Sequence, residues 1–220
     1  ELARMIHDAR IDFVRLPDEE CFDELVAQST GAAPIFGATG GVMEAALRTA
    51  ADVLEKRSVE NVEYHEVRGL AGIKEATFTL GGKELKVAVA SSTGAAKELI
   101  QRIKAGDASY AFVEVMACPG GCVNGGGQPI VSAYKRMDLD PREKRAAGLY
   151  AEDESKVIRK SHENPDIKKL YEEFLGKPNS HLAHRLLHLL PVHQTRQSAH
   201  HHAQSPYILY CHNLPVLSES

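Results

Sequence analysis

The residues best suited to metal chemistry are Cys118 and Cys122, two cysteines separated by three residues in a glycine-rich stretch. An apolar run beginning at Tyr110 precedes them and predicts a buried strand that leads into the first cysteine. The twelve residues from Cys118 to Pro129 include five glycines and two prolines, which lets the backbone turn tightly around a bulky group with its amides pointing inward. This pattern predicts an iron–sulfur centre with both cysteines as thiolate ligands.

Two cysteines do not complete a cubane, because a four-iron cluster normally takes four thiolates. The chain has two others, Cys21 and Cys211. Cys21 lies among acidic residues, which disfavour a thiolate, and Cys211 lies in a segment with no supporting local chemistry. A site built from all four cysteines is an alternative, but the residues favour a site whose remaining ligands lie outside this chain.

A second glycine-rich segment, Phe36–Gly41, precedes a helix that we expect to end near Lys56. Four apolar residues at helical spacing indicate this helix: Val42, Ala46, Ala50 and Val53. The free amides and positive dipole end of its N-terminus suit an anionic group. A nucleotide-binding turn is one interpretation, although Met43 stands where a third glycine would be and Pro34 shortens the preceding strand. A packing turn is favoured.

The rest of the chain predicts an α/β fold in which helices cover a sheet. Residues 76–80 and 85–89 alternate about Gly81 and Gly82, which predicts a hairpin. Ser92 and its neighbours predict the cap of a helix that ends at Gly106. A further strand is expected at 62–67, and further helices at 141–154 and 164–175, the last one beginning after Asn164.

The C-terminal region predicts a histidine-bearing helix over 180–190. His181, His184 and His188 share one face of that helix, as metal ligands would, but no carboxylate or cysteine joins them and packing on a neighbouring surface is favoured. Residues 189–220 are poor in charge and rich in histidine, and they predict a disordered tail in which His200–His202 could bind metal adventitiously.

Composition excludes several classes of function. The net charge of −4 provides no basic surface for nucleic acid, and no apolar segment is long enough to span a membrane. The closely spaced cysteines indicate metal binding in a reducing compartment, the cytoplasm. The opening residues Glu1–Ile6 are typical of the middle of an amphipathic helix, so we expect the chain to begin inside a domain.

These motifs resemble one protein family. Glu114–Pro129 resembles the third signature of the [FeFe]-hydrogenase large subunit, and other segments match the same family in collinear order: Phe36–Arg48, Val67–Leu70, Ser161–Pro165 and the histidines from His181. The resemblance covers residues 1–188 and implies the C-terminal portion of the two-lobed catalytic domain. It implies a mostly parallel sheet with covering helices, a β-hairpin and a helical C-terminal region, followed by a divergent tail over 189–220.

The resemblance also implies a cofactor and the roles of individual residues. The family reduces protons to hydrogen, or oxidises hydrogen, at the H-cluster, a [4Fe-4S] cubane bridged by a cysteine sulfur to a two-iron unit. Cys118 is then a cubane ligand, Cys122 the bridging ligand, and Met116 a neighbour of the two-iron unit. Phe36 and Gly37 line the pocket of that unit. Ferredoxin or another electron-carrier protein is the implied partner.

Parts of the family pattern have no counterpart in this sequence. The signatures Thr-Ser-Cys-Cys-Pro and Met-Pro-Cys-x-x-Lys are absent, and with them two cubane ligands and the proton-delivering cysteine. We therefore expect a partner that supplies the upstream half of the domain, and an isolated chain without hydrogenase activity. The alternatives are a hydrogenase-like cytosolic iron–sulfur assembly protein, a sensory hydrogenase-like domain, and a dinucleotide-binding redox module.

Overall fold

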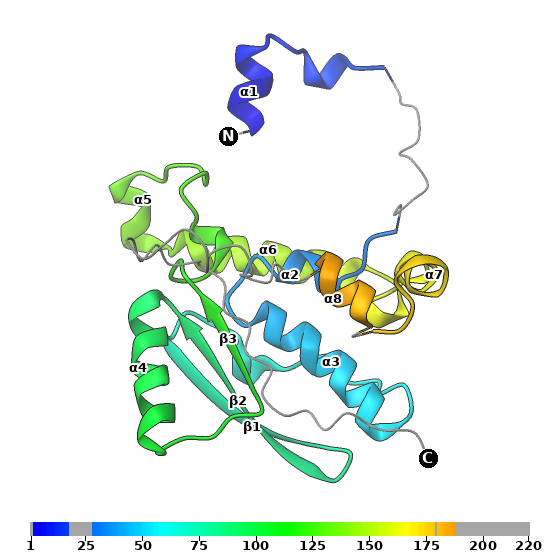
Figure 1. The fold of residues 1–220 in the computed structure, drawn as a ribbon. Helices are drawn as coiled ribbons and strands as arrows, with labels where there is room; N and C mark the ends of the chain where they lie inside the picture. The colour runs from blue at the N-terminus through cyan, green and yellow to red at the C-terminus, as the bar shows by residue number, and fades with distance from the viewer. Residues whose placement is uncertain (1, 18–27, 179, 188–220) are drawn as a thin grey trace, which may run out of the picture.

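The structure, a computed structural model, describes residues 2–17, 28–178 and 180–187. A three-stranded sheet in the order β1-β2-β3 lies at its centre. The strands are β1 (Ile73–Leu80), β2 (Lys83–Ser91) and β3 (Phe112–Met116). Helix α3 (Gly41–Glu55) covers one face of this sheet and α4 (Thr93–Ala105) covers the other (Figure 1).

The sheet is mixed. β1 and β2 form the expected antiparallel hairpin about Gly81 and Gly82, while β2 and β3 pair in parallel through the crossover helix α4. The family resemblance implied a mostly parallel sheet. In the described residues one of the two strand pairings is parallel, and the other, within the hairpin, is antiparallel. The α/β class, the hairpin and the helical C-terminal region are confirmed.

The side chains of β2 alternate between two apolar clusters. Val87 and Val89 pack with Met43 and Leu47 of α3, whereas Ala88 and its neighbours face Leu99 of α4. The apolar residues that predicted α3 do not form its most buried face, since Val53 is 53% exposed. The helix instead buries Met43, Leu47 and Ala51, a stripe at spacing four.

Local signals set several of the helix ends. Ser92 accepts a hydrogen bond from the amide of Ala95 and caps α4, which ends at Gly106 in the left-handed region. Asn164 caps α7 (Pro165–Leu170) as expected, and the helix continues as a π-helical turn, Tyr171–Leu175, that ends at Gly176. These helices are therefore bounded where the sequence places their caps.

The strand expected at 62–67 is absent from the described structure. This segment forms an extended stretch and a 3₁₀ turn, His65–Val67. The physical reason is that its polar groups are engaged by side chains: the carbonyl oxygen of Val62 accepts a hydrogen bond from Nε of Arg48 at 2.8 Å. The segment thus bonds to α3 rather than to the sheet.

The described residues contain further helices and turns. They are α1 (Leu2–Asp8), the 3₁₀ turns Phe13–Arg15, Cys122–Asn124 and Ser161–Glu163, and the helices α2 (Ala32–Ile35), α5 (Ala133–Asp138), α6 (Pro141–Ser155) and α8 (His181–Leu187). α6 runs along α2 (Figure 1). The fit is close, because a Cβ on Gly31 would lie 2.1 Å from Oδ1 of Asp153. No helix in the described ranges is long and apolar enough to cross a membrane.

Candidate metal centre

The two cysteines lie in the loop that follows β3, and both are exposed free thiols. The loop is fixed by its own backbone: the amide of Gly121 donates to the carbonyl oxygen of Cys118, and that of Gly125 to the carbonyl oxygen of Cys122, both at 2.9 Å. The amide of Gly120 donates to Oγ of Ser91, at the end of β2, at 2.8 Å. The cysteine backbone is therefore held in place while both thiols face outward.

The glycine turn Phe36–Gly41 is bonded directly to this loop. The amide of Thr39 donates to the carbonyl oxygen of Gly120, and the amide of Val123 donates to the carbonyl oxygen of Gly37, both at 3.0 Å. Gly121, at φ 94°, makes this approach possible, because a Cβ there would lie 2.7 Å from the carbonyl oxygen of Gly37. Two segments more than 75 residues apart along the chain thus form one compact unit.

The other residues singled out from the sequence lie in this unit or beside it. Met116 is half-buried at the end of β3, two residues before Cys118, and Phe36 is 45% exposed. Gly37 packs closely against α6: a Cβ at this position would lie 2.7 Å from Cδ1 of Leu149. Cys21, Cys211 and the tail over 189–220 lie outside the described residues, as does His188.

The anion at the N-terminus of α3 is a side chain of the protein itself, the carboxylate of Glu114. The carboxylate of Glu114 accepts hydrogen bonds from the amides of Gly40 and Met43, both at 2.7 Å. Burial raises the pKa of this carboxyl, and the two amides offset part of that rise. The amides that a phosphate would use are therefore already engaged, so the geometry disfavours the dinucleotide-binding alternative.

Sequence reasoning missed three polar residues that support the turn and the loop: Ser91, Lys74 and Glu114. Nζ of Lys74 donates to the carbonyl oxygens of Gly69 at 2.7 Å and Thr39 at 3.3 Å, and burial lowers its pKa to about 8. Glu114 had a recognisable signal, a carboxylate inside an otherwise apolar strand, since a buried charge requires partners.

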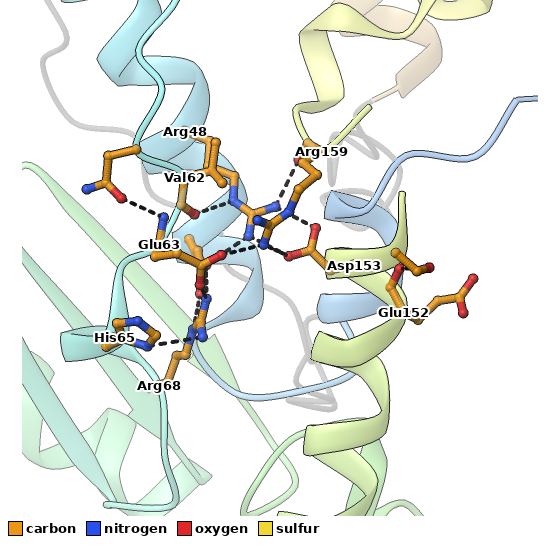
Figure 2. Close-up of polar contacts among 11 residues, drawn as sticks. Arg48, Val62, Glu63, His65, Arg68, Glu152, Asp153 and Arg159 are labelled. Carbon is orange, nitrogen blue, oxygen red and sulfur yellow. Dashed lines mark hydrogen bonds and ion pairs between the residues drawn. The ribbon is translucent and has the colours of Figure 1, made fainter. Parts of the chain in front are cut away.

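A buried ionic network connects α3 with α6 (Figure 2). The guanidinium of Arg48 donates to both carboxylate oxygens of Asp153 at 2.8 Å and to Glu44 at 2.9 Å, and all three side chains are fully buried. Burial by itself would lower the pKa of Arg48, but its bonds to Asp153 and Glu44 outweigh burial and raise it. The pKa of Asp153 is lowered by its bonds to Arg48 and Arg159, which offset burial, so the network favours the ionised forms of Arg48 and Asp153.

The network extends outward through two further arginines. Arg159 bonds to Asp153 and Glu63, both at 2.5 Å, and Arg68 bonds to Glu44 and Glu63. Arg68 also lies over the ring of Tyr150 in α6, 4.1 Å from its centre. Figure 2 shows Arg48, Arg68 and Arg159 converging with Glu63 and Asp153 between α3, the 62–68 segment and α6. The helix that begins at the glycine turn is therefore fixed to the C-terminal helices.

A second cluster with metal-type ligands is occupied by a lysine. Asp52, His162 and Glu163 form the one group of three such residues found in the described ranges, with their ligand atoms within 4.8 Å of one another. Nζ of Lys160 lies 2.9 and 2.8 Å from the two oxygens of Asp52, and His162 bonds to the same carboxylate. Because the ammonium supplies the positive charge, this cluster is an ion-pair network.

A cavity of about 430 Å³ lies beside the cysteine loop. Asn124, Gly125 and Gln128 of the loop line it, together with three arginines: Arg136, Arg142 and Arg145. Arg145 donates to the carbonyl oxygens of Val123 and Pro129, at 2.8 and 2.7 Å. The cavity therefore borders the part of the loop that follows Cys122, and one of its arginines holds the loop in place.

Comparison with known proteins identifies the class to which this fold and loop belong. Residues 1–126 match the family described as the iron only hydrogenase large subunit, C-terminal domain, and residues 139–189 match the iron hydrogenase small subunit. The chain belongs to the iron-only hydrogenase family. The two matched regions adjoin across α5, and the Arg48–Asp153 pair joins one to the other.

Individual relatives agree with this assignment. The chain is 51% identical over 188 residues to the NADP-reducing hydrogenase subunit HndD of Solidesulfovibrio fructosivorans, a match that covers 86% of this chain and 31% of the relative. It is 48% identical over 191 residues to iron hydrogenase 1 of Clostridium pasteurianum, covering 86% and 33%. A solved [FeFe]-hydrogenase HydA1 variant from Chlamydomonas reinhardtii superimposes with a TM-score of 0.63 at 38% identity, covering 84% of this chain and 52% of that one.

This chain therefore spans about a third of the length of these curated relatives and about half of the solved structure. More distant relatives have another role by name: cytosolic iron-sulfur assembly component 3 of Rattus norvegicus is 36% identical over 156 residues. The same cysteine-bearing region is thus shared by proteins named as hydrogenases and by proteins named for iron–sulfur assembly.

The donor set fits an iron–sulfur group. Cys118 and Cys122 are accessible thiols on a fixed backbone, as cluster ligands must be. In the adjoining glycine turn, Thr39 is only 2% exposed, and its hydroxyl has no hydrogen-bond partner in the described structure. A buried hydroxyl without a partner is costly, and it is available to a group bound between the turn and the loop.

Proposed function

We propose that this chain is the C-terminal portion of an [FeFe]-hydrogenase catalytic domain and provides half of the cubane ligands of an H-cluster. The observation that carries the proposal is the pair of exposed thiols, Cys118 and Cys122, on a loop bonded to the glycine turn. The higher identity to hydrogenases than to the assembly protein supports the catalytic class over the assembly class.

Each residue has a stated task in this proposal. Cys118 would hold the [4Fe-4S] cubane, and Cys122 would be the ligand shared by the cubane and the two-iron unit. Met116 would lie against that unit, and Phe36 and Gly37 would line its pocket. When bound, the H-cluster supplies the iron at which protons are reduced to hydrogen or hydrogen is oxidised. The other cubane ligands and the proton-delivering cysteine come from an upstream half of the domain, so the isolated chain is inactive in hydrogen evolution.

The partners and the compartment belong to the same proposal. Ferredoxin or another electron-carrier protein delivers electrons, and the cytoplasm supplies the reducing conditions that keep the two thiols free. A relative that is 48% identical over 151 residues is named as a periplasmic hydrogenase subunit, so the family includes members named for a second compartment. Fractionation of the source cells, with detection of this chain in the soluble cytoplasmic fraction, tests the localisation.

Anaerobic reconstitution with ferrous iron and sulfide tests the two ligands. We expect the chain to take up iron with the visible absorption of an iron–sulfur cluster, and Cys118→Ser and Cys122→Ser each to abolish most of this uptake, because serine is a poor ligand in place of thiolate. Bound iron, labile sulfide and absorption are the measurements.

Cys21→Ser is the matched control, since it also removes a thiol but leaves the loop intact; its iron content should equal that of the parent chain. Equal iron uptake by the parent and by a variant lacking both Cys118 and Cys122 would contradict the assignment. Hydrogen evolution by the matured isolated chain would contradict the proposed requirement for an upstream half.

A further inference from the structure

Two buried charges of opposite sign lie in one row across the sheet. Lys74 of β1 pairs with Val89 of β2, which in turn pairs with Glu114 of β3. Residues paired in this way project from the same face, and Val89 packs in the cluster beneath α3. Lys74 is 8% exposed and Glu114 is 5% exposed, so both charges require partners inside the protein.

Lys74 and Glu114 bond to the two polar groups of a single peptide, the one between Thr39 and Gly40. Lys74 donates to the carbonyl oxygen of Thr39, and Glu114 accepts from the amide of Gly40. In a trans peptide these two groups point in opposite directions, so the two side chains hold the Thr39–Gly40 peptide from opposite sides. The chain has no cis peptide bonds in its described residues.

Each charge also anchors a neighbouring segment. Lys74 bonds to the carbonyl oxygen of Gly69 at 2.7 Å, and Glu114 bonds to the amide of Met43 in the first turn of α3. Gly40 has a φ of 93°, and a Cβ there would lie 1.9 Å from the carbonyl oxygen of Val67. The peptide is therefore held by charge on two sides and closely packed on a third.

The preceding peptide group, Ala38–Thr39, carries this constraint to the cysteine loop. The amide of Thr39 donates to the carbonyl oxygen of Gly120, which lies between Cys118 and Cys122. Rotation of the Thr39–Gly40 peptide would reorient Thr39 and weaken that bond. The carbonyl of Gly37, two residues earlier, holds the amide of Val123 in the same way.

We propose that Lys74 and Glu114 are a pair of positioning residues that orient the Thr39–Gly40 peptide and thereby fix the glycine turn against the cysteine loop. The orientation is a property of the polypeptide alone. Its consequence for a bound cluster rests on the proposed function, because a looser turn would change the support of the group held by Cys118 and Cys122.

Hydrogen exchange of the metal-free chain tests the pair directly. In Lys74→Met and in Glu114→Gln, the amides of Thr39 and Val123 are expected to exchange about ten-fold faster, which corresponds to the loss of one charge-assisted hydrogen bond. Neither amide is bonded to Lys74 or Glu114, so faster exchange there reports the position of the turn rather than a lost direct contact.

Two exposed residues of the same sheet provide matched controls. Lys86 and Glu75 form an ion pair at 3.2 Å, partly exposed, on β2 and β1. Lys86→Met and Glu75→Gln make the same chemical changes and should leave exchange at Thr39 and Val123 as in the parent chain. Parent-like exchange at both amides in Lys74→Met and Glu114→Gln would overturn the inference.

A double variant tests the proposal even if the single variants fail to fold. Removal of one charge leaves the other buried without its opposite, whereas the Lys74→Met, Glu114→Gln double variant is neutral at both positions. We expect it to fold, with exchange at Thr39 and Val123 still faster than in the parent. A folded double variant with parent-like protection at these amides would refute the positioning role.

Iron release separates this inference from the proposed function. After reconstitution, the double variant should lose iron to a chelator several-fold faster than the Lys86→Met control. If the parent chain takes up no iron, the proposed function fails while the exchange result still decides the positioning role. If iron binds and the double variant releases it at the parent rate, the inference about cluster support fails.

Discussion

Arg48→Met is expected to destabilise the folded chain by about 3–5 kcal/mol, the range for breaking a buried ion pair from one side. The change removes the fully buried cation between Asp153 and Glu44, which keep the partly exposed Arg159 and Arg68 as charged partners. It also leaves two carbonyl oxygens, those of Val62 and Arg159, without the bonds that they accept at 2.8 Å. Methionine restores the apolar volume of the stem but none of these bonds.

Urea unfolding curves measure this loss as a lower midpoint at unchanged slope. Lys156→Met is the control, because Lys156 forms a surface pair with Glu152 at 2.7 Å within one helical turn and such pairs contribute about 0–1 kcal/mol. A midpoint for Arg48→Met close to that of Lys156→Met would show that α3 and α6 are held together by apolar contact alone.

The position of Arg48 explains why the effect should be large. Its partner Asp153 belongs to the region that matches the small subunit, while Arg48 belongs to the region that matches the large subunit. Loss of the pair therefore weakens the junction between the two regions. The glycine turn ends at the N-terminus of α3, so we expect iron uptake to fall along with stability.

Gly121→Ala is expected to separate the cysteine loop from the glycine turn. Gly121 adopts φ 94° and ψ −163°, a region that is essentially restricted to glycine and costs other residues about 1–3 kcal/mol. The added Cβ would also lie 2.7 Å from the carbonyl oxygen of Gly37 and 2.8 Å from the amide nitrogen of Thr39. These contacts are with backbone, so the loop itself must move.

That movement would break the two hydrogen bonds between turn and loop, each worth about 1 kcal/mol. Thermal unfolding should show the loss of stability, and anaerobic reconstitution should show lower iron uptake than in the parent chain. Gly126→Ala is the matched control: it lies in the same loop, its φ is not positive, and a Cβ added there would meet nothing within 4 Å. Similar iron uptake by the two variants would contradict the requirement for close contact.

Local signals in the sequence accounted for much of the fold. Ser92 with Gly106 and Asn164 with Gly176 bounded helical segments, because caps and left-handed glycines act through groups within a few residues. The hairpin at Gly81 and Gly82 was confirmed for the same reason. The strand expected at 62–67 was wrong, because the side chain of Arg48, 14 residues earlier on α3, bonds to that segment.

The anion at the N-terminus of α3 shows what the sequence could indicate and what required the tertiary structure. The glycines before Val42 correctly indicated a helix end that suits an anion. Glu114 is 74 residues away from Gly40, and no local pattern could identify it as the occupant. The register β1-β2-β3 brings its carboxylate, and the ammonium of Lys74, under the turn.

The sequence by itself determined the family of this protein and the two cysteines on which its proposed chemistry depends. Residue types and short spacings carry that information, because a cluster needs thiolates and a tight loop needs glycine. Only the tertiary structure showed that the cysteine loop and the glycine turn are bonded to each other, and that Lys74, Glu114 and Arg48 support them. These contacts join residues that are far apart in the chain, and they exist only once the sheet register and the packing of α3 on α6 are set.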